Sequence, residues 1–353
     1  MTLKALIRLL IVAVLLAGLA YWLNREPDHT SIDGFASGEK AFPSLDVNSI
    51  TGITVATLFT TSSVSRTDTS WVSDSLFGYP VEFSKVANML RTFHDLKVSQ
   101  VIRGGESMLD EFGLSRTVQG FDFMEISLSG SNMRRPLVIQ AGALKHVRGA
   151  AEFGMGMPQG RYIRVGDGPV LLVDDMLTSV IPRAEDWMNQ EIIRIPASDI
   201  VSVDVRNAGH NFSVIRVDEN TFTLGDLEAN EVISQSAATT LFQGLQWLRV
   251  EGVIDPAKSD EELGLDNPSV AVFTTSDNAA YTLRFGKDDS MVRVVSITLE
   301  IDSDAGVVNP ELMASRELFA EWRYLLGSRR ADQLLPERSQ LLETPASEFE
   351  EVE

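Results

Sequence analysis

The residue types that most often carry catalysis or bind metal ions are few in this chain of 353 residues. It contains no cysteine, which excludes disulfides, thiolate nucleophiles and cysteine-type zinc sites. Its four histidines are scattered, and none stands at the HExxH spacing that places two imidazoles on one helix face. They are His29, His94, His146 and His210. We therefore expect no metal site and no bound cofactor, and we expect His94 to be a surface residue of a helix.

Two acidic stretches could suggest calcium, namely Asp288-Asp289 and Asp302–Gly306. A calcium loop needs more oxygen ligands at regular spacing and a late glutamate, so these stretches predict turns. The GxSxG signature of a serine nucleophile is absent. The sequence thus indicates no catalytic residue, and we expect a protein that is not an enzyme. A hydrolase whose site no motif reveals is the most distant alternative.

One glycine-rich stretch, Gly154–Arg161, has glycines at the GxG spacing found in phosphate-binding loops. It lacks the Lys-Ser/Thr pair of such loops, and it precedes a predicted strand instead of joining a strand to a helix. The pattern therefore predicts a hairpin loop. Because methionine side chains adapt to varied apolar surfaces, the loop is also a candidate partner-binding segment. Its candidate contact residues are Gly154, Met155, Gly156 and Met157.

The charge balance bears on the class of partner. Fifty acidic residues against 30 basic ones give a formal net charge of −20. Such a surface repels phosphate backbones and anionic lipid headgroups, so we expect no nucleic-acid binding. The excess acid is predicted to serve solubility, and recruitment of a basic partner is the alternative.

An apolar segment near the N-terminus predicts a membrane anchor. Leu9–Leu23 carries no charge, and with the residues just before it is long enough to cross a bilayer. Lys4 and Arg8 precede it, which predicts an N-terminus in the cytoplasm and the bulk of the chain in the periplasm or another extracytoplasmic space. The predicted residues of this anchor, which would contact membrane lipid, are Leu9, Leu10, Ile11, Val12, Leu15, Leu16, Leu19, Tyr21, Trp22 and Leu23.

The competing interpretation of this segment is a cleaved signal peptide. Gly18-Leu19-Ala20 offers the small residues that a signal peptidase requires. Bulky Tyr21 and Trp22 immediately after it favour a retained, single-pass segment in the cytoplasmic membrane. Both interpretations send the remaining chain to the same compartment.

The rest of the chain repeats itself at a spacing near 150 residues. Residues 46–55 and 196–205 share an alternating pattern, in which Ile53 and Val55 correspond to Val203 and Val205. An apolar stripe at helical spacing follows in each copy. Its members are Val86, Met89, Leu90, Phe93 and Leu96 in the first copy, and Ala238, Leu241, Phe242, Leu245 and Leu248 in the second.

A short glycine turn and a pair of strands complete each copy. Leu109–Leu114 corresponds to Glu261–Leu265, and each glycine is predicted to take a positive φ. Gly142 and Gly286 end the strand pairs. Val170–Val173 followed by Asp186-Trp187 is matched with Gly306–Val308 followed by Glu321-Trp322.

These patterns predict an α+β fold: an N-terminal transmembrane helix, then two tandem, internally repeated strand-helix-strand modules with largely antiparallel sheets. The predicted boundaries are an anchor at 1–24, a tether at 25–44, module one at 45–192, module two at 193–330 and an acidic tail at 331–353.

The arrangement resembles a family catalogued as domain of unknown function 4340. The residues that carry the resemblance are the N-terminal anchor, Trp71-Val72, Leu109–Leu114, the strand pair ending at Gly142, Tyr162–Val165 and Asp186-Trp187. The second copy is more degenerate. The resemblance implies no catalytic residue. It implies a partnership with an ATP-binding-cassette permease and ATPase of the gliding-motility type, together with another membrane-anchored auxiliary protein.

We therefore expect a membrane-anchored extracytoplasmic accessory protein, an auxiliary component of an ABC-type transport or cell-envelope system. The alternative is a module that binds an envelope polymer or a small ligand.

Overall fold

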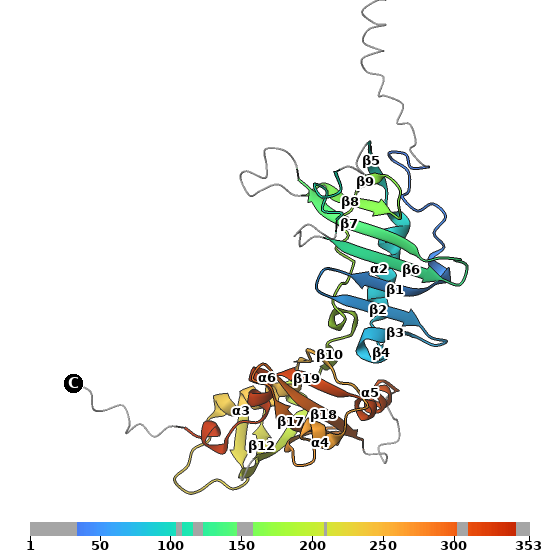
Figure 1. Cartoon of the computed structure of the whole chain (residues 1–353). Coiled ribbons are helices and arrows are strands. Elements are labelled where there is room, and N and C mark those ends of the chain that lie inside the picture. Colours follow the sequence, from blue (N-terminus) through green and yellow to red (C-terminus); the bar gives the residue numbers. More distant parts are fainter. Residues whose placement is uncertain are drawn as a thin grey trace, which may run out of the picture. The chain divides into compact units, whose positions relative to one another are not determined.

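The structure is a computed structural model that describes residues 34–103, 108–115, 123–146, 158–207, 210–301 and 310–343. The described chain forms two units (Figure 1). Unit 1 comprises the residues up to Trp71 together with Phe83–Arg183. Unit 2 comprises Val72–Glu82 and the chain from Ala184 onward.

The first sheet has nine strands in the order β4-β3-β2-β1-β6-β7-β8-β9-β5. The neighbouring pairs whose registers are defined are antiparallel. The strands are β1 (Ile50–Ala56), β2 (Thr61–Arg66), β3 (Trp71–Ser73), β4 (Tyr79–Pro80), β5 (Val98–Ile102), β6 (Met124–Gly130), β7 (Leu137–Lys145), β8 (Gly160–Val165) and β9 (Val170–Val173).

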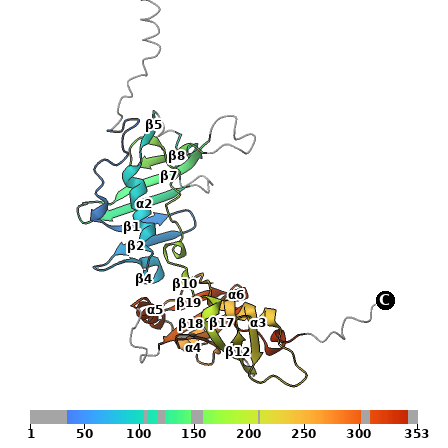
Figure 2. The same cartoon turned by 180° about the vertical axis from the view of Figure 1, so that it is seen from behind.

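One helix covers one face of this sheet. Helix α2 (Phe83–Asp95) buries Val86, Met89, Leu90 and Phe93, which repeat at the spacing of a single helical face. Figure 2 shows α2 lying across the strands. Residues along the strands alternate between buried and more exposed positions, and in β1 the side chains of Ile53 and Val55 are fully buried. The apolar pattern of the sequence therefore defines the core of unit 1.

The second sheet has eight strands in the order β13-β12-β11-β16-β17-β18-β19-β15. They are β11 (Ile200–Asn207), β12 (His210–Asp218), β13 (Thr221–Leu224), β15 (Gly252–Val253), β16 (Ser269–Thr275), β17 (Ala280–Asp288), β18 (Val292–Glu300) and β19 (Arg323–Gly327). A separate antiparallel pair joins β10 (Glu191–Ile193) to β14 (Leu248–Arg249).

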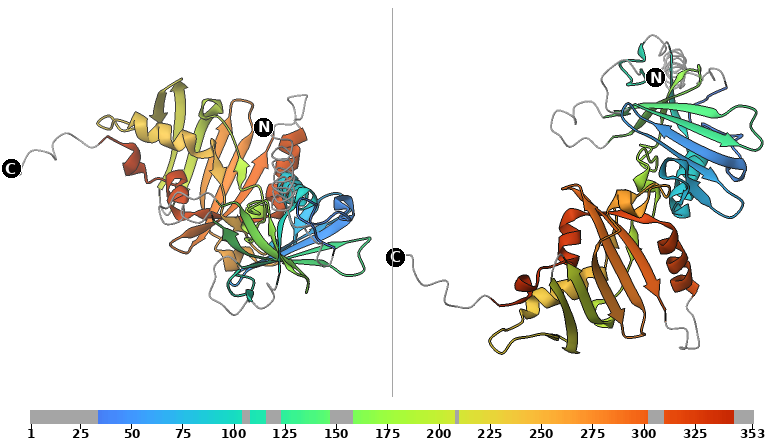
Figure 3. Two further views of the ribbon diagram at one scale, coloured as in Figure 1. Left: turned by 90° about the horizontal axis from the view of Figure 1, so that it is seen from above. Right: turned by 60° about the horizontal axis from the view of Figure 1, so that its bottom comes forward.

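Helices surround this second sheet, and Figure 3 (right) shows α5 in dark red beside the orange strands. The helices are α3 (Gln235–Phe242), α4 (Asp260–Leu263), α5 (Pro310–Glu321) and α6 (Ser328–Leu334). Short 3-10 helices in the two units are η1 (Val47–Ser49), η2 (Asp74–Leu76), η5 (Glu185–Trp187), η6 (Ala197–Asp199), η7 (Gln243–Leu245) and η9 (Arg338–Leu341). Phe319 of α5 and Leu334 of α6 are buried in the core of unit 2. The helical stripe predicted for this module ends early, because α3 stops at Phe242 and Leu248 belongs to β14.

The two sheets share one strand order once β4 is set aside. Strands β1 and β11 occupy equivalent places in the two sheets, and each begins after a 3-10 helix. The register of β1 with β6 and that of β11 with β16 shift after the first residue, at Ile50 and at Ile200. An equivalent backbone hydrogen bond closes the corner at the start of each of these strands. Ser131 N donates to Ser49 O at 2.9 Å, and Ser276 N donates to Asp199 O at 2.8 Å. The two sheets are therefore built on one plan.

The glycine turns also match. Gly113 has a φ of 65° and Gly264 a φ of 68°, which confirms the predicted left-handed conformation. Gly142 and Gly286 lie directly against the carbonyls of these turns. A Cβ at Gly142 would stand 2.1 Å from Phe112 O, and one at Gly286 would stand 2.2 Å from Leu263 O.

The predicted fold class, α+β with a transmembrane helix, is wrong for the described residues. Antiparallel strands dominate them, because each helix only covers a sheet whose own alternating residues supply most of the core. No helix among them is long and apolar enough to cross a membrane. The predicted anchor Leu9–Leu23 and the predicted loop Gly154–Met157 lie outside the described residues.

The proposed correspondence of Trp187 with Trp322 does not follow the sheet order. Strand β9 occupies the place that β19 occupies in the second sheet. Trp187 comes after β9, in η5, whereas Trp322 immediately precedes β19. Both indoles are buried, so each fills its own part of a core.

Candidate functional site

Of the four histidines, the structure describes His94, His146 and His210. His94 is exposed on α2, as predicted, and its Nδ1 lies 2.8 Å from Asp95 Oδ1. The hydrogen bond from His94, aided by Lys40, lowers the pKa of Asp95. Within the described ranges, no three His, Asp or Glu side chains lie close enough together to hold a metal ion.

Unit 2 contains a cavity of about 460 Å³. One wall is formed by β10, η6 and the residues that join them, Ile192–Pro196 and Asp199. The hairpin that joins β16 to β17 supplies Thr275–Asp277, and β17 adds Tyr281. Helix α5 closes the opposite side with residues between Glu311 and Phe319. The cavity therefore depends on three chain segments that are far apart in the sequence.

Apolar side chains form much of the lining. Ile192, Ile195 and Leu312 are half-buried residues packed against the core of unit 2. Phe319 lies behind them at 2% exposure. These residues line the cavity with hydrocarbon, as in most small-ligand sites.

Tyr281 contributes to this cavity a hydroxyl that forms no hydrogen bond within the described chain. Its side chain points to the helix-covered face of the sheet, as its register neighbours Phe273 and Leu299 do, and only 5% of it is exposed. No described residue exchanges a hydrogen bond with its hydroxyl. Burial, together with the charge of Asp277, raises the pKa of Tyr281 to about 12. The phenol is therefore neutral at physiological pH and can donate or accept a hydrogen bond.

Three carboxylates line the same cavity, those of Asp199, Asp277 and Glu311. Ser198 Oγ donates to Asp199 Oδ1 at 3.0 Å, and the Thr275 hydroxyl donates to Asp277 Oδ1. Both of these partners are neutral. Neither aspartate forms an ion pair with a cation in the described chain, so their negative charges remain uncompensated.

Arg194, the cation of the lining, is engaged elsewhere. Its Nε lies 2.5 Å from Glu191 Oε1, and its guanidinium lies 4.3 Å from the centre of the Trp247 ring. The hydrogen bond from Arg194 lowers the pKa of Glu191. Trp247 is 50% exposed, which places an aromatic surface beside this arginine. The cavity as a whole is acidic.

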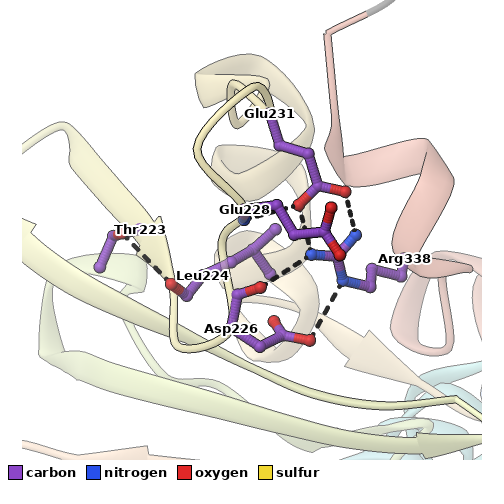
Figure 4. A network of polar contacts seen from close by, with 6 residues as sticks. All are labelled: Thr223, Leu224, Asp226, Glu228, Glu231 and Arg338. Carbon is purple, nitrogen blue, oxygen red and sulfur yellow. Dashed lines mark hydrogen bonds and ion pairs between the residues drawn. The ribbon is translucent and has the colours of Figure 1, made fainter.

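A second polar cluster, in the same unit, has a structural character (Figure 4). Arg338 of η9 donates to both carboxylate oxygens of Glu231, at 2.6 and 2.5 Å, and its Nε lies 3.2 Å from Asp226 Oδ2. The hydrogen bond from Arg338 lowers the pKa of Glu231 to about 2. Ser234 N also donates to Leu341 O, so this cluster fixes the last described segment to the loop before α3.

The geometry of the cavity suits the binding of a ligand. A neutral phenol, carboxylates and an apolar wall can together hold a ligand that brings positive charge.

Sequence reasoning missed these residues. Tyr281 lies in strand β17, and Asp277 stands in a hairpin turn, where aspartate is common. The available signal was indirect: Tyr281 places a hydroxyl at a buried position of a strand, and such a group needs a partner.

Comparison with known proteins identifies the family to which the chain belongs. Neither the curated proteins nor the solved structures gave a match. A family model described as domain of unknown function (DUF4340) matches residues 71–268, which is more than half of the chain and includes parts of both units. The chain belongs to the DUF4340 family.

Proposed function

We propose that this protein acts by recognition, as an extracytoplasmic accessory subunit of an ABC-type transport or cell-envelope system. The observation that carries the proposal is the acidic cavity of unit 2. In this cavity the Tyr281 hydroxyl has no hydrogen-bond partner and the aspartates have no cationic partner within the described chain. A basic segment of another subunit would satisfy these groups. The family resemblance supports the setting, because it implies a partnership with a transporter.

The apolar segment Leu9–Leu23 supports the proposed location. Lys4 and Arg8 ahead of it favour export of everything that follows. Retention at the cytoplasmic membrane would confine the protein to a thin layer and raise its effective concentration toward a membrane-bound partner.

The location is testable because the chain has no cysteine. A Met291→Cys variant would place one thiol at a position that is 81% exposed. We expect a membrane-impermeant maleimide to label it in intact cells whose outer envelope has been permeabilised. Labelling only after the cytoplasmic membrane is broken would contradict the proposal.

The partnership is tested by photocrosslinking from the cavity. Benzoylphenylalanine at Ser315, which lines the cavity, should give a defined adduct with a transporter subunit or another envelope protein. The same group at Val217, an exposed position outside the cavity lining, serves as the control. Adducts of equal yield from both positions, or none from Ser315, would contradict recognition through the cavity.

A small-ligand module is the second candidate, and the cavity volume favours it. About 460 Å³ falls within the range of roughly 300–1,000 Å³ typical of ligand pockets. If this candidate is right, mass spectrometry of the full chain isolated under native conditions will detect one co-purifying small molecule, which the Tyr281→Phe variant loses. A native sample without such a molecule counts against it.

A further inference from the structure

We infer that the unit 2 cavity binds an organic cation carried on a hydrocarbon stem, either the side chain of a lysine or arginine in a partner protein or a free alkylamine. The inference rests on the proposed function, because it names the ligand of the same site. Three independent features of the cavity lead to it: its charge, the hydroxyl of Tyr281 and its apolar wall.

The negative charge of the cavity lining determines which ligand charge it favours. Asp199, Asp277 and Glu311 face one space, and Arg194 is already held by Glu191 and Trp247. An anionic ligand would be repelled by all three carboxylates. A neutral polar ligand would displace water from them without supplying a counter-charge, which is costly. A cation gains from Asp199 and Asp277, whose side-chain hydrogen-bond partners are neutral hydroxyls.

The hydroxyl of Tyr281 is the second, independent feature. It belongs to a residue that is only 5% exposed, it lines the cavity, and it forms no hydrogen bond within the described chain. The hydroxyl is therefore free to bind a ligand in the cavity. A neutral phenol can accept a hydrogen bond from an ammonium or guanidinium donor while donating its own proton to water or a carboxylate.

The apolar wall of the cavity favours a cation that is attached to a hydrocarbon chain. Ile192, Ile195, Leu312 and the buried Phe319 present hydrocarbon to the same cavity as the carboxylates. A bare metal cation would leave this surface wet. Lysine and arginine carry three or four methylenes below their charge, and these can cover apolar surface while the charge meets the carboxylates.

The test is calorimetric titration of the full chain in detergent with four probes: n-butylammonium, agmatine, a lysine-rich peptide and n-butanol as the uncharged control. We expect the three cations to bind and n-butanol not to bind, with affinity falling as salt rises. Equal binding of n-butanol, or no binding of any cation, would overturn the inference.

Matched variants locate the binding. Asp277→Asn and Asp289→Asn each remove one negative charge, but only Asp277 lines the cavity. We expect Asp277→Asn to weaken cation binding roughly tenfold and Asp289→Asn to leave it unchanged. Glu311→Gln repeats the test from α5 in case Asp277→Asn disturbs the hairpin. Tyr281→Phe should weaken binding about threefold while preserving the packing. Equal effects at Asp277 and Asp289 would overturn the assignment.

The probes also separate the two sources of the cation. A peptide that binds more tightly than agmatine and n-butylammonium indicates a protein partner, and tighter binding of the free amines indicates a small molecule. If cations bind in the cavity but crosslinking recovers no envelope protein, the proposed function fails and the ligand class stands. If crosslinking from Ser315 succeeds and Asp277→Asn leaves both binding and crosslinking intact, the ligand class fails and the proposed function stands.

Discussion

The corner at the start of β1 in unit 1 and the corner at the start of β11 in unit 2 share a backbone and differ in side chains. Both are closed by the same hydrogen bond, from Ser131 N to Ser49 O in the first and from Ser276 N to Asp199 O in the second. The strand registers then pair equivalent positions. Gly130 corresponds to Thr275 and Leu137 to Tyr281.

The difference between the corners shows how a scaffold becomes a site. At these positions unit 1 has serine, glycine and leucine, which carry no charge. Unit 2 has aspartate, threonine and tyrosine. Unit 2 also inserts α5 between β18 and β19, whereas only Gly166–Pro169 joins β8 to β9 in unit 1. Side-chain replacement supplies the polar groups, and the inserted helix supplies the wall that encloses them.

The largest expected effect comes from removing that wall. Phe319→Ala would leave a hole under α5 and should lower the free energy of unfolding by about 4 kcal/mol. Phe83→Ala makes the same chemical change at a position that is 65% exposed, and should cost less than about 0.5 kcal/mol. Urea unfolding of both variants checks this. Similar losses in the two would mean that α5 is not anchored as described.

The second largest effect is expected from substituting the two glycines that lie against the equivalent turns of the two units. Gly142→Ala and Gly286→Ala each force a methyl group onto a backbone carbonyl, and each should cost about 3 kcal/mol. Gly225→Ala is the control, since its nearest neighbours stand 3.8 Å away. Thermal unfolding monitored with limited proteolysis would show which unit opens. A loss in one variant and none in the other would end the equivalence of the two turns.

A smaller loss of stability is expected from removing the N-terminal cap of α4. Ser259 accepts a hydrogen bond from Glu262 N, and the Glu262 side chain accepts one from Ser259 N. Ser259→Ala should cost about 1 kcal/mol, because it leaves an amide at the helix start unpaired. Ser259→Asp keeps an acceptor at the cap and should restore most of the loss in the same urea assay. If Ser259→Asp is as unstable as Ser259→Ala, the cap is not the cause.

The smallest expected effect concerns the Arg338 cluster, and it depends on pH. The pKa of Glu231 is lowered from its ordinary value of 4.5 to about 2, so the folded state holds this proton less tightly than the unfolded state. The stabilisation is therefore complete above about pH 4.5 and is lost as the pH falls toward 2. The difference in Tm between wild type and Glu231→Gln should shrink over this window. Glu228→Gln, in the same loop, is the control variant; a parallel trend in it would mean that general acid unfolding is responsible.

Local sequence patterns predicted much of each unit. The stripe at Val86, Met89, Leu90 and Phe93 identified the covering helix, because burial on a helix follows its own period. The glycines of the two turns were predicted to have positive φ because no other residue takes it without strain. Such features depend on a few neighbouring residues, and a sequence displays them directly.

Predictions that needed long-range pairing fared worse. Trp187 and Trp322 were matched by their spacing from short apolar runs, and the sheet order separates them. The balance of strand and helix was misjudged for a related reason. Short apolar runs of similar composition serve strands and helices alike, and only their partners decide between them.

The sequence by itself determined the acidic balance, the absence of cysteine, the alternation of the strands and the glycine turns, because each of these is a property of composition or of near neighbours. Only the tertiary structure decided that Asp199, Asp277 and Glu311 share a space with the hydroxyl of Tyr281. The first and last of these residues, 199 and 311, lie 112 positions apart in the sequence. They meet because the register of β11, β16 and β17 and the packing of α5 bring them together, and no local pattern encodes that register.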